Sequence, residues 1–202
     1  QFNSNGLLKV SGGNFTATSG LMAFNSNGNA FDFRGIDSFN ANGGMISVAA
    51  QNTLTNYYPD GVELYDFMHS GLDSTLKITG DVTIANSFTC NGLGTYSTYI
   101  NSTGTLYVKG DVTSMGNGCR QVAGNGIRLI GSGTQTVQSA DAGWHLLPTF
   151  VIDSTGTVNL QGDFWFTNHF IYLQGNVNAN ADAIFGTGSN GSISILAGPI
   201  SF

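Results

Sequence analysis

The chain has 202 residues, a net charge of −6 and a pI near 4.6, and 9% of its residues are charged, against about 25% in typical soluble domains. Its six Lys and Arg residues offer no basic surface to neutralise phosphates, which excludes nucleic acid and anionic membrane surfaces as partners. The 14 Phe, 7 Tyr and 2 Trp predict a folded chain, and the single Glu, Glu63, argues against long helices.

No apolar run approaches the roughly 20 residues that a membrane helix needs, so we expect no membrane insertion. No charged and then apolar segment precedes Gln1. We therefore expect a mature secreted form, extracellular or on the cell surface, from which a signal peptide has been removed.

The length fits a single all-β domain over residues 1–202. Short strands are expected at Gly6–Val10 and Met45–Ala49, between Gly and Asn turns. Residues 1–70 have the weaker strand pattern, and we interpret them as a less regular N-terminal part or cap. Residues 71–202 carry the strand repeats.

The segment Tyr57–His69 gathers the residue types that a polysaccharide-cleaving site needs. It contains three carboxylates, one histidine and four aromatic side chains: Asp60, Glu63, Asp66, His69, Tyr57, Tyr58, Tyr65 and Phe67. Their spacing matches no catalytic motif, and Pro59-Asp60-Gly61 is an ordinary turn. We expect no enzymatic activity, and predict Tyr57, Tyr58 and Tyr65 as candidates for surface binding.

A strand, a Gly-Asp bend and a second strand recur three times, at 74–84, 104–114 and 156–166. Apolar residues alternate at period two in each copy, so one side faces inward. The bends at Gly80, Gly110 and Gly162 are 30 and 52 residues apart, which predicts rungs of about 20 to 30 residues with occasional excursions.

Rungs of this kind bury their apolar side by stacking on one another, so the pattern predicts a parallel β-solenoid with irregular rungs. An antiparallel β-sandwich or jelly roll, with strands about every 8 to 12 residues, is the alternative. Further strands are expected at Gly126–Ile130 and Ser192–Leu196.

Asp81, Asp111 and Asp163 follow the three bends in register, as a ladder of cation ligands would. Asp after Gly also bonds its own backbone, and the calcium-binding nonapeptide of β-roll proteins is absent. We therefore expect turns and neither a metal nor a cofactor. His145 and His169 have no nucleophile pattern beside them, and we expect packed or surface histidines.

Cys90 lies ten residues after Gly80 and Cys119 lies nine after Gly110, so the cysteines occupy nearly equivalent places in two repeats. On stacked rungs they would be neighbours, at a strand spacing of about 4.8 Å that a disulfide accepts. We expect a Cys90–Cys119 disulfide, worth about 3.5 kcal/mol for a loop of about 30 residues and formed in an oxidising exterior. Two buried free thiols are the alternative.

Four strand segments resemble the β-helical repeats of large bacterial surface adhesins and secreted surface proteins: Ile127–Val137, Leu147–Asp153, Gly156–Leu160 and Ile171–Val177. The resemblance extends over residues 74–180 and rests on Gly-rich strand repeats. It implies a parallel β-solenoid and a cell-surface context, and it carries no enzymatic residues.

Low charge is tolerable if much of the surface is buried against identical copies, so we predict an extracellular structural protein, either a self-assembling filament subunit or a surface adhesin module. Copies of the chain and a cell-surface glycan are the expected partners. The apolar ends supply the expected subunit contacts: Gln1, Phe2, Ile193, Ile195, Leu196, Ile200 and Phe202. The alternative is a glycan- or ice-binding module, because Thr-x-Thr recurs five times, as at Thr134–Thr136.

Overall fold

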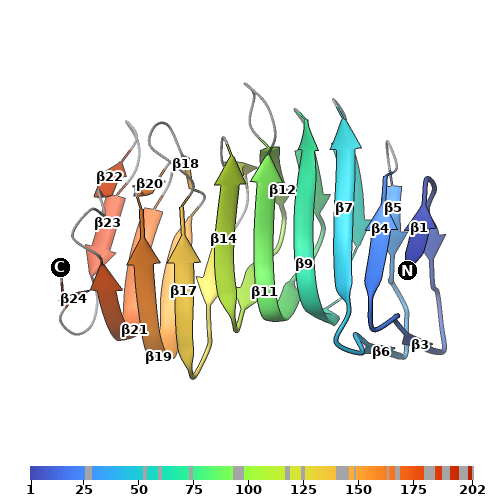
Figure 1. Ribbon diagram of the computed structural model, residues 1–202, viewed down its shortest axis with the longest axis horizontal. Helices are drawn as coiled ribbons and strands as arrows, with labels where there is room; N and C mark the ends of the chain where they lie inside the picture. Colours follow the sequence, from blue (N-terminus) through green and yellow to red (C-terminus); the bar gives the residue numbers. More distant parts are fainter. Residues whose placement is uncertain are drawn as a thin grey trace.

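We analysed a computed structural model of the chain. It describes residues 1–25, 29–51, 54–58, 61–72, 75–92, 98–116, 119–123, 126–139, 146–147, 149–162, 164–166, 169–179, 185–187, 192–195 and 200–201. Within these residues the regular structure consists of β-strands, with no helix. The strands lie side by side along the long axis of the molecule, with the N-terminus at one end and the C-terminus at the other (Figure 1).

The strands form three faces, and several long strands bend from one face to the next. The first face holds β1 (Phe2–Ser4), β4 (Leu21–Phe24), β7 (Met45–Gln51), the second halves of β9 (Glu63–Leu72) and β11 (Val82–Gly92), β14 (Asp111–Gly116), β17 (Thr134–Gln138), the second halves of β19 (Phe150–Gln161) and β21 (His169–Ala179), and β24 (Ile200–Ser201).

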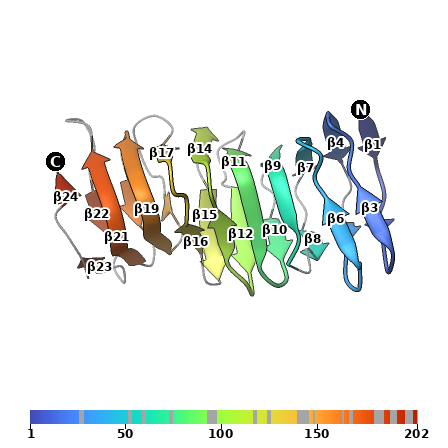
Figure 2. The same cartoon turned by 90° about the horizontal axis from the view of Figure 1, so that it is seen from below.

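The second face holds β3 (Asn14–Thr16), β6 (Ser38–Asn40), the first halves of β9, β11, β19 and β21, β13 (Leu106–Val108), β16 (Ile127–Leu129) and β23 (Ser192–Ile195). The third face holds β2 (Leu8–Lys9), β5 (Asn29–Asp32), β8 (Leu54–Tyr58), β10 (Thr75–Ile78), β12 (Thr98–Ser102), β15 (Cys119–Ala123), β18 (Leu146–Leu147), β20 (Phe164–Phe166) and β22 (Phe185–Thr187). Figure 2 shows the same stack turned by 90°.

Every strand pairing in the described residues is parallel. Steps along the first face advance by 19 to 25 residues, the extremes being Leu160 to Ala179 and Val112 to Val137. The expected parallel β-solenoid is therefore confirmed, and the antiparallel sandwich is wrong. The pairing begins at β1, so residues 1–70 are part of the same coil.

The three Gly-Asp bends lie at three different corners of the coil, not at equivalent ones. Gly80 leads from the third face to the second, Gly110 from the second to the first, and Gly162 from the first to the third. Each copy of the motif therefore lies one face further along the coil. A spacing of 30 residues is one turn plus about one face, and a spacing of 52 residues is two turns plus about one face. The expected register of Asp81 with Asp111 is wrong, and Asp163 lies outside the described residues.

Both described aspartates act between rungs. Asp81 Oδ1 accepts a hydrogen bond from the backbone N–H of Thr105 at 2.8 Å, and Asp111 Oδ1 accepts one from Thr136 at 2.7 Å. Each bond joins a corner to the next rung, so the expected turn role extends to holding successive rungs together.

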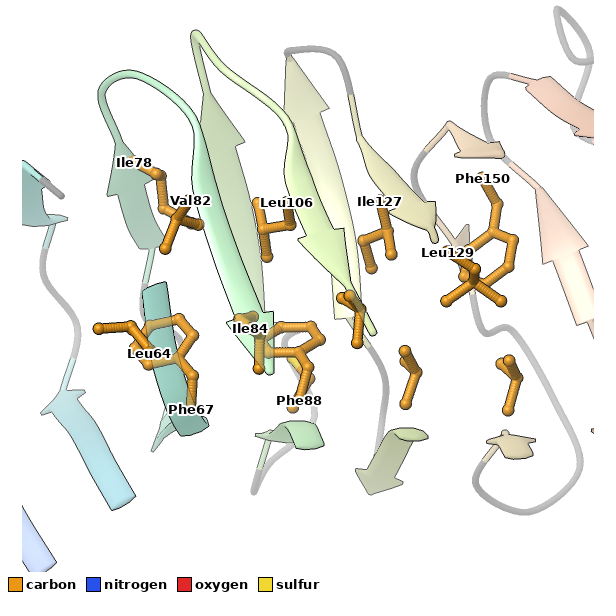
Figure 3. Close-up of a cluster of buried hydrophobic side chains, with 14 of the residues drawn as sticks. Leu64, Phe67, Ile78, Val82, Ile84, Phe88, Leu106, Ile127, Leu129 and Phe150 are labelled. Carbon is orange, nitrogen blue, oxygen red and sulfur yellow. The ribbon is translucent and has the colours of Figure 1, made fainter. Parts of the chain in front are cut away.

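The core is a column of apolar side chains inside the coil. Figure 3 shows inward residues from successive rungs one behind another, such as Val82, Leu106 and Ile127. Phe67 and Phe88 stack with ring centroids 5.8 Å apart. Burial of such side chains contributes about 1.5 to 3 kcal/mol each, and no rung could bury its share alone.

At some corners, successive rungs approach so closely that a side chain has no room. A Cβ atom on Gly110 would lie 1.5 Å from the carbonyl oxygen of Asn86 on the preceding rung. A Cβ atom on Gly133 would meet nothing within 4 Å. The stacking of the rungs therefore requires glycine at position 110.

We predict that Gly110→Ala lowers the free energy of unfolding by about 2 kcal/mol or more, because backbone must move to admit the methyl group. Gly133→Ala is the matched control and should change it by less than about 0.5 kcal/mol. Urea denaturation followed by circular dichroism measures both. Equal stability of the two variants would contradict the close approach at Gly110.

Candidate functional site

The segment that the sequence singled out is divided among the faces of the coil. Tyr57 and Tyr58 lie on β8 in the third face, Glu63 and Tyr65 are exposed on the second face, and His69 points into the core. The side chains of Tyr57 and Tyr58, and all of Pro59 and Asp60, lie outside the described part of the chain. Of the three tyrosines predicted for surface binding, the structure thus places Tyr65 on the surface.

The two described carboxylates of this segment have separate partners. Glu63 Oε2 accepts a hydrogen bond from Lys109 Nζ at 2.5 Å, and both side chains are about half exposed. Asp66 Oδ1 accepts hydrogen bonds from Asn86 Nδ2 at 2.7 Å and from Ser87 Oγ at 2.5 Å. Glu63 and Asp66 are thus each bonded to other side chains and are not arranged as the two paired carboxylates of a glycoside-cleaving site.

A groove runs between β6 and β9 on the second face. β6 pairs with β3, and β9 pairs with β7 and β11, but no strand pairing joins β6 to β9 in the described residues. Two hollows of about 360 and 280 Å³ open along this gap and share Phe39 and Glu63 in their linings. We call this feature the β6–β9 groove.

One wall of the β6–β9 groove is the turn after β6. Asn42 is in the left-handed region (φ 51°), and Gly44 N–H donates to Ala41 O at 3.0 Å. Asn42 N–H donates to Asn40 Oδ1 at 2.9 Å, and Asn42 Nδ2 donates to Ala17 O at 3.1 Å. These bonds fix the wall in one conformation before any ligand arrives.

The opposite wall is the start of β9, which is held in place by β11. Glu63 pairs with Thr83 and Leu64 with Ile84, and the register then shifts so that Tyr65 lies opposite a bulge in β11. Bulges bend the strand and turn a side chain away from the regular surface. Tyr65 is 39% exposed, one of the few large apolar side chains on the described surface. The floor includes the buried Leu64 and the half-buried Phe39.

The surface next to the groove holds most of the described ion pairs. Glu63, Thr83, Tyr107 and Arg128 are register neighbours in one row. Arg128 donates to Asp153 Oδ2 from Nε at 3.0 Å and from Nη2 at 2.5 Å, and Gln174 Nε2 donates to Asp153 Oδ1 at 2.7 Å. Together with Lys109 and Glu63, these charges neutralise one another in pairs.

His69 is a fully buried histidine in the core. Its register partners are Val48 and Cys90, and its Nδ1 lies 3.2 Å from the carbonyl oxygen of Val48. Nε2 has no hydrogen-bond partner in the part of the chain that the structure describes. Burial lowers the pKa of His69 to about 4, against the smaller opposing effect of the hydrogen bond to Val48. The imidazole is therefore neutral at pH 7.

The other sequence candidates for chemistry are dispersed. His169 is exposed at the start of β21, and His145 lies outside the described residues. No group of three or more His, Cys, Asp or Glu side chains is close enough to hold a metal ion in the described ranges. The same residues contain no helix that could span a membrane. Thr16 lies on the second face and Thr134–Thr136 on the first, so these Thr-x-Thr motifs share no single surface.

The two cysteines are not register neighbours, which corrects the argument from repeat position. Cys90, on the first face, pairs with Ser114, whereas Cys119, on the third face, pairs with Thr98. Cys90 is 1% exposed, and the side chain of Cys119 lies outside the described part. Because Cys90 and Cys119 lie on different faces, strand register alone does not bring them together, and the Cys90–Cys119 disulfide stays a prediction.

The fold defines the chain as a parallel β-solenoid with three faces. Comparison of the chain with protein-family models, with curated proteins and with solved structures gave no match. The parallel β-solenoid that the resemblance to surface adhesins implies is confirmed. The assignment to an adhesin family has no support.

Sequence reasoning singled out Glu63 and Tyr65 but missed the opposite wall of the groove. Asn40 and Asn42 lie one rung earlier in the chain, and only the stacking of rungs brings them beside Tyr65. The one available signal was Asn42-Gly43-Gly44, a turn sequence that predicts a tight, rigid corner.

We predict that His69 makes the fold sensitive to acid. An unfolded histidine titrates near 6.5, so between pH 6.5 and about 4 the unfolded chain binds a proton that the folded chain does not. The contribution of neutral His69 to the free energy of unfolding is complete above pH 6.5. It falls by about 3 kcal/mol as the pH drops to about 4. Urea denaturation between pH 7 and 4 measures it.

The matched variants separate His69 from the carboxylates that titrate in the same range. His69→Leu should flatten the dependence on pH by about that amount, whereas His169→Gln, which changes an exposed histidine, should keep it. Identical pH profiles for His69→Leu and the unchanged protein would show that His69 is protonated or solvated in the fold.

Proposed function

We propose that the chain is an extracellular structural protein that assembles end to end with copies of itself, as a filament subunit or as part of a surface adhesin. The observation that carries the proposal is the N-terminal end of the coil. There β1, β2 and β3 each pair on one side only in the described residues. Unpaired edges of this kind are templates for a further strand layer.

The same end carries exposed apolar side chains. Phe2 is 39% exposed and Leu7 is 47% exposed, and both lie in the first rung. Phe2 packs one rung inward on Phe24, with ring centroids 5.9 Å apart, so a rung added from outside would continue this aromatic column. Covering each side chain would contribute about 1.5 to 3 kcal/mol to association.

The C-terminal end offers the complementary edge. β23 and β24 both pair with β21 of the same chain, and β22 pairs with β20. Ile193, Ile195 and Ile200 are therefore strand residues of the last rung, in register with the buried Phe170, Tyr172 and Val177. Leu196 and Phe202 lie outside the described residues. We propose that this last rung receives the first rung of the next copy, with parallel strands about 4.8 Å apart.

Low charge supports an assembling role. A monomer usually needs charge over about a quarter to a third of its surface to remain soluble, and the chain has 9% charged residues. A surface of uncharged polar residues tolerates burial against another copy at a lower desolvation cost than a charged one.

We predict that the chain forms oligomers or filaments at neutral pH, and that Phe2→Asp with Leu7→Asp shifts it to monomers by placing charge at the proposed contact. Tyr65→Asp, which alters a comparably exposed aromatic side chain on the second face, is the control and should leave assembly unchanged. Size-exclusion chromatography with light scattering and negative-stain microscopy measure both. A monomer at all concentrations in the unchanged protein would refute the proposal.

We also predict the extracellular disulfide Cys90–Cys119. Alkylation of the denatured chain should label neither cysteine before reduction and both after it, and Cys90→Ala with Cys119→Ala should lower stability by about 3 kcal/mol. Reduction should destabilise the unchanged protein and have no effect on the double variant. Labelling of both thiols in protein purified from an oxidising compartment would show that the pair is free.

A further inference from the structure

The β6–β9 groove and the row beside it combine an exposed aromatic ring with uncharged hydrogen-bonding groups. Asn40 Oδ1 accepts a hydrogen bond from the backbone N–H of Asn42 within the turn, and Asn42 Nδ2 donates to Ala17 O on the preceding rung. Nδ2 of Asn40, Oδ1 of Asn42 and the hydroxyl of Tyr65 have no partner in the part of the chain that the structure describes, and they border the 360 Å³ hollow. A donor, an acceptor and a hydroxyl thus surround a concave site of a size that fits a small-molecule group.

We propose that this surface binds an uncharged, extended polysaccharide. Sugars present an apolar face of C–H groups and a rim of hydroxyls, so they bind where an aromatic ring lies beside amide and hydroxyl groups. Tyr65 supplies the ring, and Asn40 and Asn42 supply the amides. Because the turn at Asn42 and the pairing of β9 with β11 hold the backbone on both sides of the groove, little backbone order is lost on binding.

The solenoid also matches the shape of such a chain. Successive strands are about 4.8 Å apart, which is close to the length of one sugar ring in an extended chain. A polysaccharide that leaves the groove along the long axis would therefore meet about one rung per sugar. It crosses β11 over the small Thr83 and Ala85 and reaches Tyr107 on β13, two rungs from Tyr65.

The charges on this face favour an uncharged ligand over an acidic one. Lys109 and Arg128 are each bound to a carboxylate of the same face, Glu63 and Asp153. A sulfate or uronate group would meet cations whose charge a carboxylate already neutralises, and it would approach a chain of net charge −6. Hydroxyl groups can instead bond to the half-exposed Glu63 and Lys109 without breaking the pair.

This site is independent of end-to-end assembly because it lies on a lateral face. Stacking of copies through the first and last rungs would leave the groove open and repeat it along a filament. Failure of assembly would thus leave the binding test intact, and failure of binding would leave assembly intact.

The test is calorimetric titration of the whole chain with soluble hexamers of glucose, xylose, mannose and N-acetylglucosamine, and with hexagalacturonate as the acidic probe. We expect binding to at least one uncharged hexamer. Tyr65→Ala should weaken it by about tenfold or more, since an aromatic ring at the centre of a site contributes on this scale. Tyr65→Phe should bind nearly as well, because it keeps the ring.

Phe2→Ala is the matched control, since Phe2 and Tyr65 have the same exposed fraction, 39%, and Phe2 lies at the end of the coil. It should bind like the unchanged protein. Unfolding midpoints check that each variant is folded. Absence of binding to all four uncharged hexamers, binding to hexagalacturonate alone, or equal affinity of Tyr65→Ala and the unchanged protein would each overturn the proposal.

Discussion

The parallel hydrogen-bond ladder between successive rungs is the interaction on which the structure depends. A single rung has too little apolar surface to be stable, so each strand takes its backbone partners and its hydrophobic neighbours from the rungs before and after it. This requirement reaches the corners as well. Gly110 has no room for a side chain because Asn86 lies against it, and the carboxylates of Asp81 and Asp111 bond to backbone N–H groups one rung further on. The bend at Gly110-Asp111 thus permits close stacking, and the carboxylates of Asp81 and Asp111 are both bonded to backbone N–H groups.

Stacking leaves two kinds of surface with different chemical properties. The lateral faces have satisfied backbones and present only side chains, and most of the described ion pairs lie on the second face, where Glu63, Lys109, Arg128 and Asp153 neutralise one another. The ends present the edges of strands, and Phe2 and Leu7 are exposed at one of them. The proposed association with copies through the ends and the proposed recognition of a ligand on a lateral face therefore involve separate parts of the molecule, and both are compatible with low charge.

The β6–β9 groove lies where the regular ladder of the second face is interrupted. On either side of it the strands are fixed, by the turn at Asn42 and by the bulge opposite Tyr65, so the interruption is a defined shape. Where neighbouring strands are paired, their backbone hydrogen bonds hold them together and close such a gap. The departure from regularity gives the candidate site its depth, and residues from successive rungs give it its chemistry.

The sequence by itself located several strands and favoured their parallel stacking over an antiparallel sandwich. Gly and Asn turns delimited β2, β7, β16 and β23, and recurrence of strand, bend and strand predicted a solenoid. It did not determine register, because a Gly-Asp bend fits any corner, and only the number of residues between corners decides which face follows. The sequence therefore suggested that Asp81 is equivalent to Asp111, and Cys90 to Cys119. In each pair the second residue lies one face further along the coil. The joining of Tyr65 with Asn40 and Asn42 was decided by tertiary structure alone, since their proximity depends on the length of a complete turn and not on any local pattern.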